Sequence, residues 1–525
     1  QVSADGRVLK AYNSNYPNFI YELHNIEQFG VWNNETQKGQ DFDLVALRDL
    51  THAGEEILLR GDKGWQTKTA GTPTTVTYSF MQQAPSSGGE GGTGFVALNS
   101  QQQQVVRDLF YVLQQQTGLS FVEAAGDTGQ IRFGVNQQTN TRGYSFLPDT
   151  YKGDARAGDV WLDVETANVM QPGQEGYYVL LHELGHALGL QHPLPESDTS
   201  GATVLLNSLA IPSNTLMLEL SASSTSGSWP SWFGSFDLQA LRALYGARAY
   251  ASGNDVYKFI DSSSPMTLID DGGVDTLDAS AVSISVSIDL HSGASSSIGM
   301  SAEGIAKHNN VSIVSGTLIE NVIGSPYDDV IIGNAANNFV TFTGGNDIVD
   351  GDAGLDSVRF WSGSNNMRIA KDSATGYWNA EALNNEGGSI ELRQVERLVF
   401  TDFNWALDSG DNESAGRTVK ILGAVFGKEG LANMAYRGIG LFYFDRNMSY
   451  EDLTLLALDA RVGPGASKAT VAQLLQSNVP GLVIDPNAYS NTTAMAIYAQ
   501  ESALNKAMVD VVGLATAGMP YQFWG

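Results

Sequence analysis

A nine-residue period between residues 324 and 358 restricts the fold of this chain more than any other feature. Four polar residues stand nine apart: Asp329, Asn338, Asp347 and Asp356. Two positions after each stands an aliphatic residue: Ile331, Val340, Val349 and Val358. Glycine precedes three of the polar residues by five positions, at Gly324, Gly333 and Gly351. A polar turn followed by one inward aliphatic residue, repeated at so short a period, is typical of strands that coil into a parallel β-roll.

The same polar positions predict bound metal ions. Turns eighteen residues apart stack on one side of such a roll, where carboxylates and backbone carbonyls converge on a hard cation such as Ca²⁺. We therefore predict several structural Ca²⁺ ions, with Asp329, Asn338, Asp347 and Asp356 among their ligands. Phe342 stands where the fourth glycine belongs, so we expect fewer ions than a perfect array would hold. A solvated acidic loop is the simpler alternative, but it leaves the aliphatic register unexplained.

A second stretch, residues 182 to 192, carries three of the chain's seven histidines. On a helix, His182 and His186 lie one turn apart on the same face, so both imidazoles can reach one metal ion. Gly189 tolerates a positive φ, which lets the chain bend and return His192 as a third ligand. Three neutral nitrogens with an open fourth position describe a catalytic zinc site, whereas a structural site is closed by four ligands.

Glu183 follows the first of these histidines, where its carboxylate can take a proton from a metal-bound water. The alternative is an ordinary buried helix with Leu184 and Leu188 in the core. Those leucines fit a core, but a buried helix needs neither three histidines nor a glutamate within eleven positions. The complete pattern resembles the metzincin signature.

The composition limits both ligands and partners. The chain has 525 residues, no cysteine and a formal net charge of −28. Without thiolates, zinc must be held by histidine and carboxylate. The charge argues against nucleic acid as a partner and suits a chain that binds hard cations. No run of about twenty apolar residues occurs, so no membrane insertion is expected. No signal-peptide pattern follows Gln1, so either a leader is missing or export uses none.

The patterns divide the chain into four units of a multidomain α+β protein. Residues 1–70 form an N-terminal extension that could be a pro-segment, residues 71–246 a protease domain, 247–410 the roll with a β cap, and 411–525 a helical domain. In the second unit we expect strands at 74–80, 119–123, 130–135 and 158–163, and helices after Ser100 and from Phe236 to Gly246. In the last unit, helices begin near Ala415, behind a cap at Ser449, and near Thr493.

Residues from about 70 to 360 resemble the serralysins, secreted bacterial metzincins with a β-roll behind the protease. Beyond the zinc motif, the likeness runs through residues 158–162, 236–246, 253–257, 270–278 and 316–321. It implies a zinc endopeptidase with one catalytic Zn²⁺ and an RTX calcium-binding roll. Export by a type I secretion machinery, without a cleaved signal, is implied as well. The resemblance also implies that Gly253, Asp270, Gly272 and Asp275 hold Ca²⁺ where protease and roll meet.

Met217 is the candidate for the methionine turn that lies under the zinc ligands of metzincins, although a plain core methionine fits the same position. Serralysins carry a tyrosine two residues later, which reaches the zinc and helps to stabilise the oxyanion. This chain has Glu219 there. Loss of one oxyanion donor costs on the order of a hundredfold or more in other enzymes.

These observations predict a secreted endopeptidase that cleaves proteins or peptides, with Glu183 as general base and the strand at Gly158 and Val160 pairing with extended substrate. The main alternative is a calcium-binding cell-surface or surface-layer protein whose protease domain is weak, latent or dedicated to one partner. Such a surface-protein partner would dock through residues 411–525. A further alternative is a latent precursor with residues 1–70 in the cleft, where an aspartate such as Asp62 would replace the excluded thiolate switch.

Overall fold

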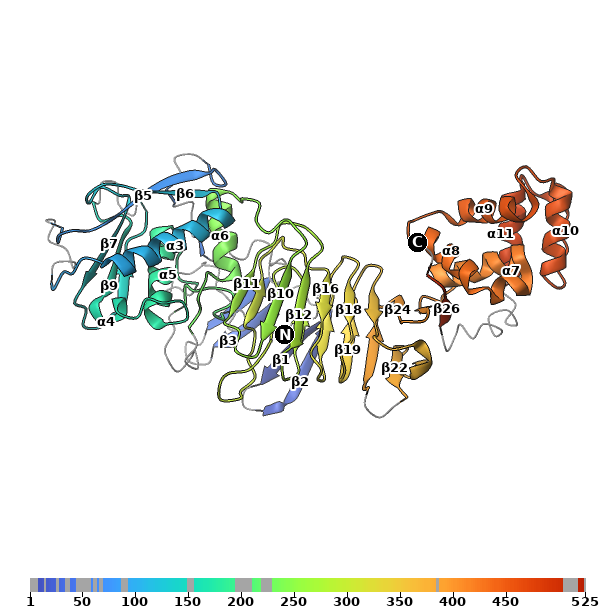
Figure 1. The fold of residues 1–525 in the computed structure, drawn as a ribbon, viewed down its shortest axis with the longest axis horizontal. Coiled ribbons are helices and arrows are strands. Elements are labelled where there is room, and N and C mark those ends of the chain that lie inside the picture. The colour runs from blue at the N-terminus through green and yellow to red at the C-terminus, as the bar shows by residue number, and fades with distance from the viewer. Residues whose placement is uncertain are drawn as a thin grey trace.

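The structure is a computed structural model of the 525-residue chain. It describes the backbone of four N-terminal strands and then residues 58–59, 64–65, 69–85, 93–148, 155–193, 210–218, 229–383, 387–503 and 518–523. The N-terminal strands pair as two antiparallel hairpins, β1 (Val8–Asn13) with β2 (Tyr16–His24) and β3 (Gln28–Asn33) with β4 (Lys38–Asp43). The remaining residues form an α/β unit, a coil of strands and a group of helices in a row (Figure 1).

The α/β unit is built on a five-stranded sheet with the order β6-β5-β7-β9-β8. Its strands are β5 (Thr74–Phe80), β6 (Leu119–Glu123), β7 (Ile131–Asn136), β8 (Gly143–Ser145) and β9 (Asp159–Asp163). Four of them run parallel, and β8 alone is antiparallel, at one edge. The expected strands are all present. The edge strand β8 was not anticipated, because three residues that include a glycine carry no alternating pattern.

Helices complete this unit. They are α3 (Ser100–Gln116), α4 (Val164–Ala167), α5 (Glu175–Ala187) and α6 (Ser235–Tyr245). Helix α3 starts with a capping box between Asn99 and Gln102 and buries Leu109 and Phe110, the latter stacked on Phe121 with ring centroids 3.9 Å apart. Leu58 and Leu59 are also buried in this core, and Trp65 packs against it. The boundary expected at residue 70 is therefore too late, because Leu58, Leu59 and Trp65 already belong to this core.

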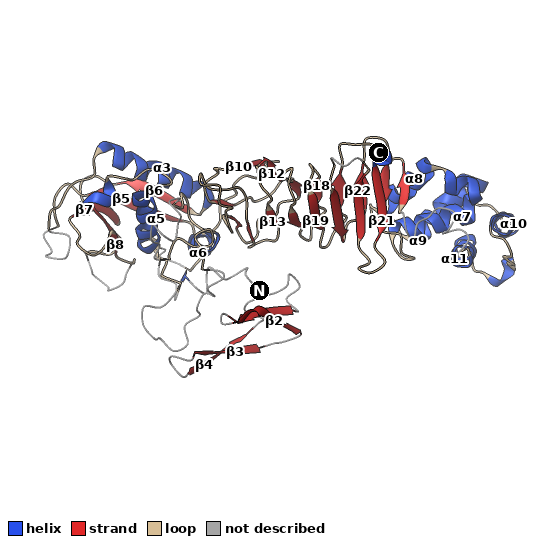
Figure 2. Cartoon of the chain, turned by 90° about the horizontal axis from the view of Figure 1, so that it is seen from below, coloured by secondary structure: helices blue, strands red, loops and turns tan. Residues whose placement is uncertain are grey.

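The second unit, which we call the roll, is a coil of short strands (Figure 2). One sheet has the order β10-β12-β16-β18-β20-β24-β25-β26, a second β13-β17-β19-β23-β22-β21, and a small third β11-β15-β14. The strands in chain order are β10 (Val256–Ile260), β11 (Met266–Leu268), β12 (Thr276–Ala281), β13 (Ser287–Asp289), β14 (Ser295–Ser296), β15 (Val311–Ile313), β16 (Asn321–Ile323), β17 (Val330–Ile332), β18 (Phe339–Thr341), β19 (Asn346–Asp350), β20 (Ser357–Arg359), β21 (Met367–Lys371), β22 (Trp378–Ala382), β23 (Ser389–Arg393), β24 (Arg397–Val399), β25 (Asn404–Ala406) and β26 (Met519–Tyr521).

The register of the roll follows the nine-residue period. Val340 lies opposite Val358 in one sheet, and Ile331 lies opposite Val349 in the other, so neighbours within a sheet are eighteen residues apart. All four aliphatic residues are buried. Consecutive repeats thus alternate between two parallel sheets and share one core, as the period predicts.

Helices make up most of the third unit: α7 (Ser414–Ala432), α8 (Met434–Phe444), α9 (Tyr450–Val462), α10 (Lys468–Asn478) and α11 (Thr492–Ser502). The cap at Ser449 is confirmed, since its side chain accepts a hydrogen bond from the Asp452 amide. The last expected helix begins at Thr492, and residues 504–517 lie outside the described part. Strand β26 pairs with β25 of the roll, so residues 411–525 are not a purely helical domain.

Polar contacts join the three units. Arg242 of α6 pairs with both carboxylate oxygens of Asp271, at 2.9 and 2.7 Å, at the start of the roll. At its far end, the buried Arg397 pairs with Asp408 at 2.6 Å and with Asp445 of the helical unit at 2.5 Å. Within the described part of the chain, no helix combines the length and apolar character needed to cross a bilayer.

Candidate active site

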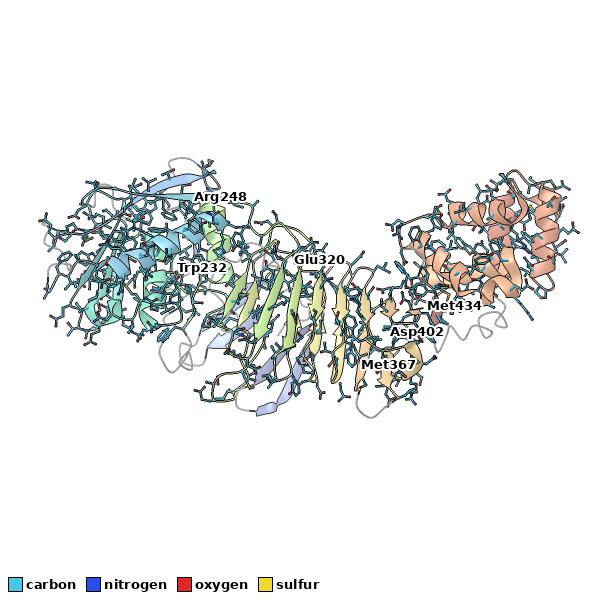
Figure 3. The ribbon with its side chains drawn as sticks, viewed as in Figure 1. Trp232, Arg248, Glu320, Met367, Asp402 and Met434 are labelled. Atoms are coloured by element: carbon cyan, nitrogen blue, oxygen red, sulfur yellow. The ribbon has the colours of Figure 1, made fainter. Side chains whose placement is uncertain are left out.

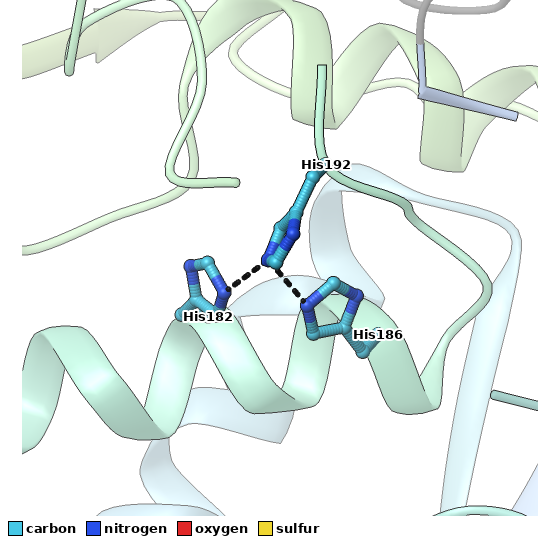
Figure 4. A group of neighbouring side chains, drawn as sticks. All are labelled: His182, His186 and His192. Carbon is cyan, nitrogen blue, oxygen red and sulfur yellow. Dashed lines mark hydrogen bonds between the residues drawn. The ribbon is translucent and has the colours of Figure 1, made fainter. Parts of the chain in front are cut away.

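Helix α5 places two of the predicted metal ligands. It is buried over nearly its whole length and presents His182 and His186 one turn apart. The helix ends as the Gly189 amide donates to the His186 carbonyl at 2.8 Å. Gly189 then adopts φ 105°, a value that favours glycine, and the chain turns back toward the helix. This turn brings His192 over the same face of α5, as predicted (Figure 4).

The three imidazoles converge through their Nε2 atoms. His192 Nε2 lies 3.1 Å from His182 Nε2 and 3.1 Å from His186 Nε2 (Figure 4). The Nδ1 atoms of His182 and His186 face the carbonyls of Leu216 and Leu190, at 2.7 and 2.8 Å. Because a carbonyl only accepts, each Nδ1 carries the hydrogen, and each Nε2 lone pair points at its neighbours.

This donor set fits a zinc ion. Lone pairs so close repel one another unless a cation lies between them, and tetrahedral Zn²⁺ with bonds of about 2.0–2.1 Å spaces its ligand nitrogens about 3.3 Å apart. Burial lowers the pKa of His182 to about 4. Burial, with the neighbouring imidazoles, also holds the pKa of His186 well below its usual value. Both rings are therefore neutral at pH 7, which metal ligation requires.

Glu183 lies beside this centre on the same helix. Its Oε2 accepts a hydrogen bond from the Ser145 hydroxyl of β8 at 2.8 Å. Burial raises the pKa of Glu183 to about 7, and the Ser145 hydrogen bond opposes that rise. A carboxyl group poised near neutrality can take up a proton and release it again, which suits a general base.

A cavity of about 470 Å³ opens above these residues. It lies between α5 and the β8 segment and is lined by Asn140, Thr141, Arg142, Gly143, Tyr144, Ser145, Tyr178, Val179, His182, Glu183, His186 and His192. Among the described strands, β8 pairs only with β9 and forms one edge of the sheet. Within the described part of the chain, β8 thus has a neighbouring strand on one side only, and its residues line the cavity beside the histidines.

The strand expected to bind substrate does not have a free edge. Val160 is buried in β9, which is hydrogen bonded to β7 on one side and to β8 on the other. Gly158 precedes β9 with φ 81°, and a Cβ there would meet Trp65 Cζ2 at 2.5 Å. The assignment of Gly158 and Val160 to substrate pairing is wrong, because both sides of β9 are already paired.

Met217 lies beneath the metal-binding helix. It is fully buried, and a Cβ added to Gly185 would meet its Sδ at 2.6 Å. Asp237 of α6 accepts hydrogen bonds from the Leu216 and Gly234 amides, at 2.7 and 2.8 Å, and from the Thr215 hydroxyl at 2.7 Å. A buried carboxylate thus fixes the turn whose Leu216 carbonyl orients His182. Glu219 lies outside the described residues.

A second cluster of possible metal ligands lies where the α/β unit meets the roll. Ligand atoms of Asp255, Asp270 and Asp275 lie within 4.8 Å of one another. The Gly272 amide donates to Asp270 at 3.0 Å, and a Cβ at Gly273 would lie 1.8 Å from the Gly253 carbonyl oxygen. Asp275 Oδ2 is buried without a hydrogen-bond partner, an arrangement that a hard cation would satisfy. Asp270 and Asp275 were expected here from the resemblance, whereas Asp255 was not.

The three aspartates of the period, Asp329, Asp347 and Asp356, do not form such a cluster among the described residues. Asp347 instead accepts a hydrogen bond from the Asp329 amide at 2.9 Å, and Asp356 accepts one from the Asn338 amide at 2.7 Å. Burial raises the pKa of Asp347 to about 8 and that of Asp356 to about 7. Their part in binding Ca²⁺ stays a prediction.

Comparison with known proteins agrees with this geometry. Residues 65–205 match the Matrixin family model, and residues 236–431 match the model described as Peptidase M10 serralysin C terminal. In both regions the chain resembles the serralysin-like metzincins. It is 30% identical over 321 residues to Serralysin G of Dickeya chrysanthemi, and this alignment covers 55% of this chain and 65% of that relative. It is 30% identical over 307 residues to a Serralysin C of the same organism, 52% of this chain and 62% of the relative.

Serralysin of Proteus mirabilis is 28% identical over 351 residues, 60% of this chain and 69% of that protein. The chain therefore spans less than two thirds of the length of the first two relatives, and their alignment covers little more than half of it. The regions matched by the two family models include the three histidines, Glu183 and the roll from β10 to β25.

Proposed function

We propose that this serralysin-like metzincin is a zinc-dependent endopeptidase that hydrolyses peptide bonds of extended proteins or peptides. The observation that carries the proposal is the convergence of three imidazole Nε2 atoms beside a buried glutamate, in a cleft lined by the edge strand β8. His182, His186 and His192 would hold one Zn²⁺ and leave its fourth position toward the cleft.

When bound, Zn²⁺ supplies a Lewis acid that polarises the scissile carbonyl and lowers the pKa of a water molecule to about 7. Glu183 takes the proton of the attacking water and gives it to the departing amine nitrogen. Ser145 orients the Glu183 carboxylate through its hydroxyl. The free edge of β8 pairs with an extended substrate by β-augmentation and lays the scissile bond across the histidines.

The proposal extends to the roll and to the route of export. Several Ca²⁺ ions would stabilise it, one of them held by Asp255, Asp270 and Asp275, where three carboxylates and one unpartnered buried oxygen require a cation. Low calcium inside the cell and millimolar calcium outside would let such a roll order after export. Secretion by a bacterial type I machinery rests on the resemblance to serralysins.

One observation favours a second function. An apolar cavity of about 220 Å³ lies between α7, α8 and α9, lined by residues that include Ile421, Phe426, Tyr436 and Leu456. Leu455 and Leu456 of α9 are more than 40% exposed. These features support a cell-surface or surface-layer-associated protein with a dedicated or latent protease, which docks a partner through its helices.

The deciding experiment is cleavage of unfolded casein by the full chain with zinc and millimolar calcium. Glu183→Ala should keep one zinc per chain by metal analysis and lose nearly all turnover, because only the proton acceptor is removed. Glu165→Ala, which removes an exposed glutamate of α4, should cleave like the wild type. Retained turnover in a zinc-loaded Glu183→Ala protein would overturn the mechanism. A zinc-loaded wild type that leaves casein intact would favour the dedicated or latent enzyme.

A further inference from the structure

The turn that carries His192 is held from outside the zinc motif. The Trp65 indole Nε1 donates to the carbonyl of Ala187, the last residue of α5, at 2.8 Å. The Trp65 amide donates to the Tyr245 hydroxyl at 3.2 Å, and that hydroxyl donates to the Leu188 carbonyl at 2.7 Å. The Gln191 amide donates to the Leu58 carbonyl at 2.9 Å. Three bonds therefore reach residues 187–191 from two distant parts of the chain.

These partners are themselves fixed by packing. Leu58 and Tyr245 are fully buried in the core of the α/β unit. The Trp65 ring packs against Gly158, so closely that a Cβ at Gly158 would meet it at 2.5 Å. Tyr245 closes α6, far along the chain from the zinc helix. The hydrogen-bonding groups that face the turn therefore have little freedom to move.

The turn needs such support for two reasons. The last carbonyls of a helix lack intrahelical partners, and here Trp65 and Tyr245 satisfy those of Ala187 and Leu188. Gly189 has a φ of 105°, and glycine has the widest conformational freedom of any residue type. The turn would therefore lose order without hydrogen bonds from outside it. Because His192 follows Gln191 directly, movement of the turn moves the third imidazole away from the other two.

We propose that Leu58, Trp65 and Tyr245 are positioning residues of the metal centre, which hold the Leu188–Gln191 turn so that His192 meets His182 and His186. The inference rests on the proposed zinc site. It makes Leu58 and Trp65 a permanent part of the protease. Any cut that removes an N-terminal segment and leaves an active enzyme must therefore fall before Leu58.

The test uses the full chain with two substitutions. Trp65→Phe replaces the indole by a smaller phenyl ring and removes the donor to Ala187. Tyr245→Phe keeps the ring and removes the hydroxyl that donates to Leu188 and accepts from the Trp65 amide. Trp232→Phe and Tyr78→Phe are the matched controls in the same unit. The Trp232 indole donates to Gln116 at 2.8 Å and the Tyr78 hydroxyl to Glu123 at 3.2 Å, and neither bond reaches the turn (Figure 3 labels Trp232).

Zinc affinity is measured by competition with a chromophoric chelator. Loss of outer-shell hydrogen bonds typically weakens metal binding about 10–100-fold, so we expect at least a tenfold loss in both test variants and less than twofold in the controls.

Equal zinc affinity in the test variants and the controls would overturn the inference. A second measurement needs no variant: in the zinc-free wild type, the Gln191 amide should exchange its hydrogen slowly, and fast exchange would also overturn it. Neither readout depends on hydrolysis. A wild type that binds zinc but cleaves nothing refutes the proposed function alone, whereas cleavage with unchanged affinity in Trp65→Phe refutes the positioning role alone.

Discussion

Replacement of Asp237 should release the turn beneath the metal centre. The carboxylate is fully buried, and its Oδ2 accepts from the Leu216 and Gly234 amides while Oδ1 accepts from the Thr215 hydroxyl. Asp237→Ala leaves two buried amides without an acceptor, at about 1–3 kcal/mol each. The hydroxyl can turn to another acceptor, so we count only the amides and expect about 3 kcal/mol or more.

Asp237→Asn is the matched variant. Its carboxamide oxygen can still accept from both amides, and its NH₂ group can donate to the Thr215 oxygen. It therefore loses the charge but not the acceptors, and we expect a cost of about 1 kcal/mol. Burial raises the pKa of Asp237 to about 7, so the comparison belongs at pH 8, where the native carboxyl group is ionised.

Hydrogen exchange at the Leu216 and Gly234 amides measures this loss directly. A local loss of about 3 kcal/mol speeds exchange roughly hundredfold, since 1.4 kcal/mol corresponds to a factor of ten. Asp237→Asn should speed it less than tenfold. Zinc affinity should fall in Asp237→Ala as well, because the Leu216 carbonyl orients His182. Unchanged exchange at Leu216 in Asp237→Ala would refute the assignment of this carboxylate as the anchor of the turn.

Two further predictions concern the roll. Hydrogen bonding to Asp289, together with the charge of Asp352, raises the pKa of His291, so its stabilising effect is fully present below the unfolded-state pKa of about 6.5 and is lost as the pH rises through the raised folded value. The free energy of unfolding of His291→Gln, measured by thermal unfolding, should therefore lie below that of the wild type at pH 5.5, by about 1 kcal/mol or less. At pH 9 the two values should match, and an equal difference at both pH values would contradict this. Arg397→Met removes a buried cation from the partly buried Asp408 and Asp445 and should cost about 3–5 kcal/mol by calorimetry. Arg368→Met, whose pair with Glu381 is exposed, should cost less than about 1 kcal/mol, and similar losses would show that burial is not the cause.

Features that depend on local periodicity could be predicted from the sequence. The spacing of His182, His186 and His192 is set by helix geometry and one glycine, and the alternating strands follow from the nine-residue period. Ser145 and Asp237 could not be found in this way, because each acts on the centre from another element across the fold. A three-residue edge strand such as β8 has too few positions for a pattern, so the substrate strand was assigned to its neighbour β9.

The calcium cluster shows the same limit. Asp270 and Asp275 were named through the resemblance, whereas Asp255 lies on the preceding coil and joins them only when β10 pairs with β12. Trp65 was placed in the N-terminal extension because the neighbouring sequence is the same kind for a surface tryptophan as for one that contacts α5, the helix that carries His182 and His186. Its partner, the Ala187 carbonyl, is 122 residues away.

Strand β26 changes how the helical unit is attached. The chain leaves the roll after β25, forms α7 to α11 and returns to pair with β25, so the helices are inserted between two neighbouring strands of one sheet. Arg437 of α8 donates to the Pro520 carbonyl at 2.9 Å, and the Gln522 amide donates to the Met434 carbonyl at 3.0 Å, which fastens the returning strand to the helices as well (Figure 3 labels Met434). Because the inserted helices are attached to the sheet at both ends, they have less freedom to rotate than a domain joined by a single linker. A molecule bound by these helices would be held at a fixed distance and angle from the catalytic cleft, and the length of the roll would set that distance.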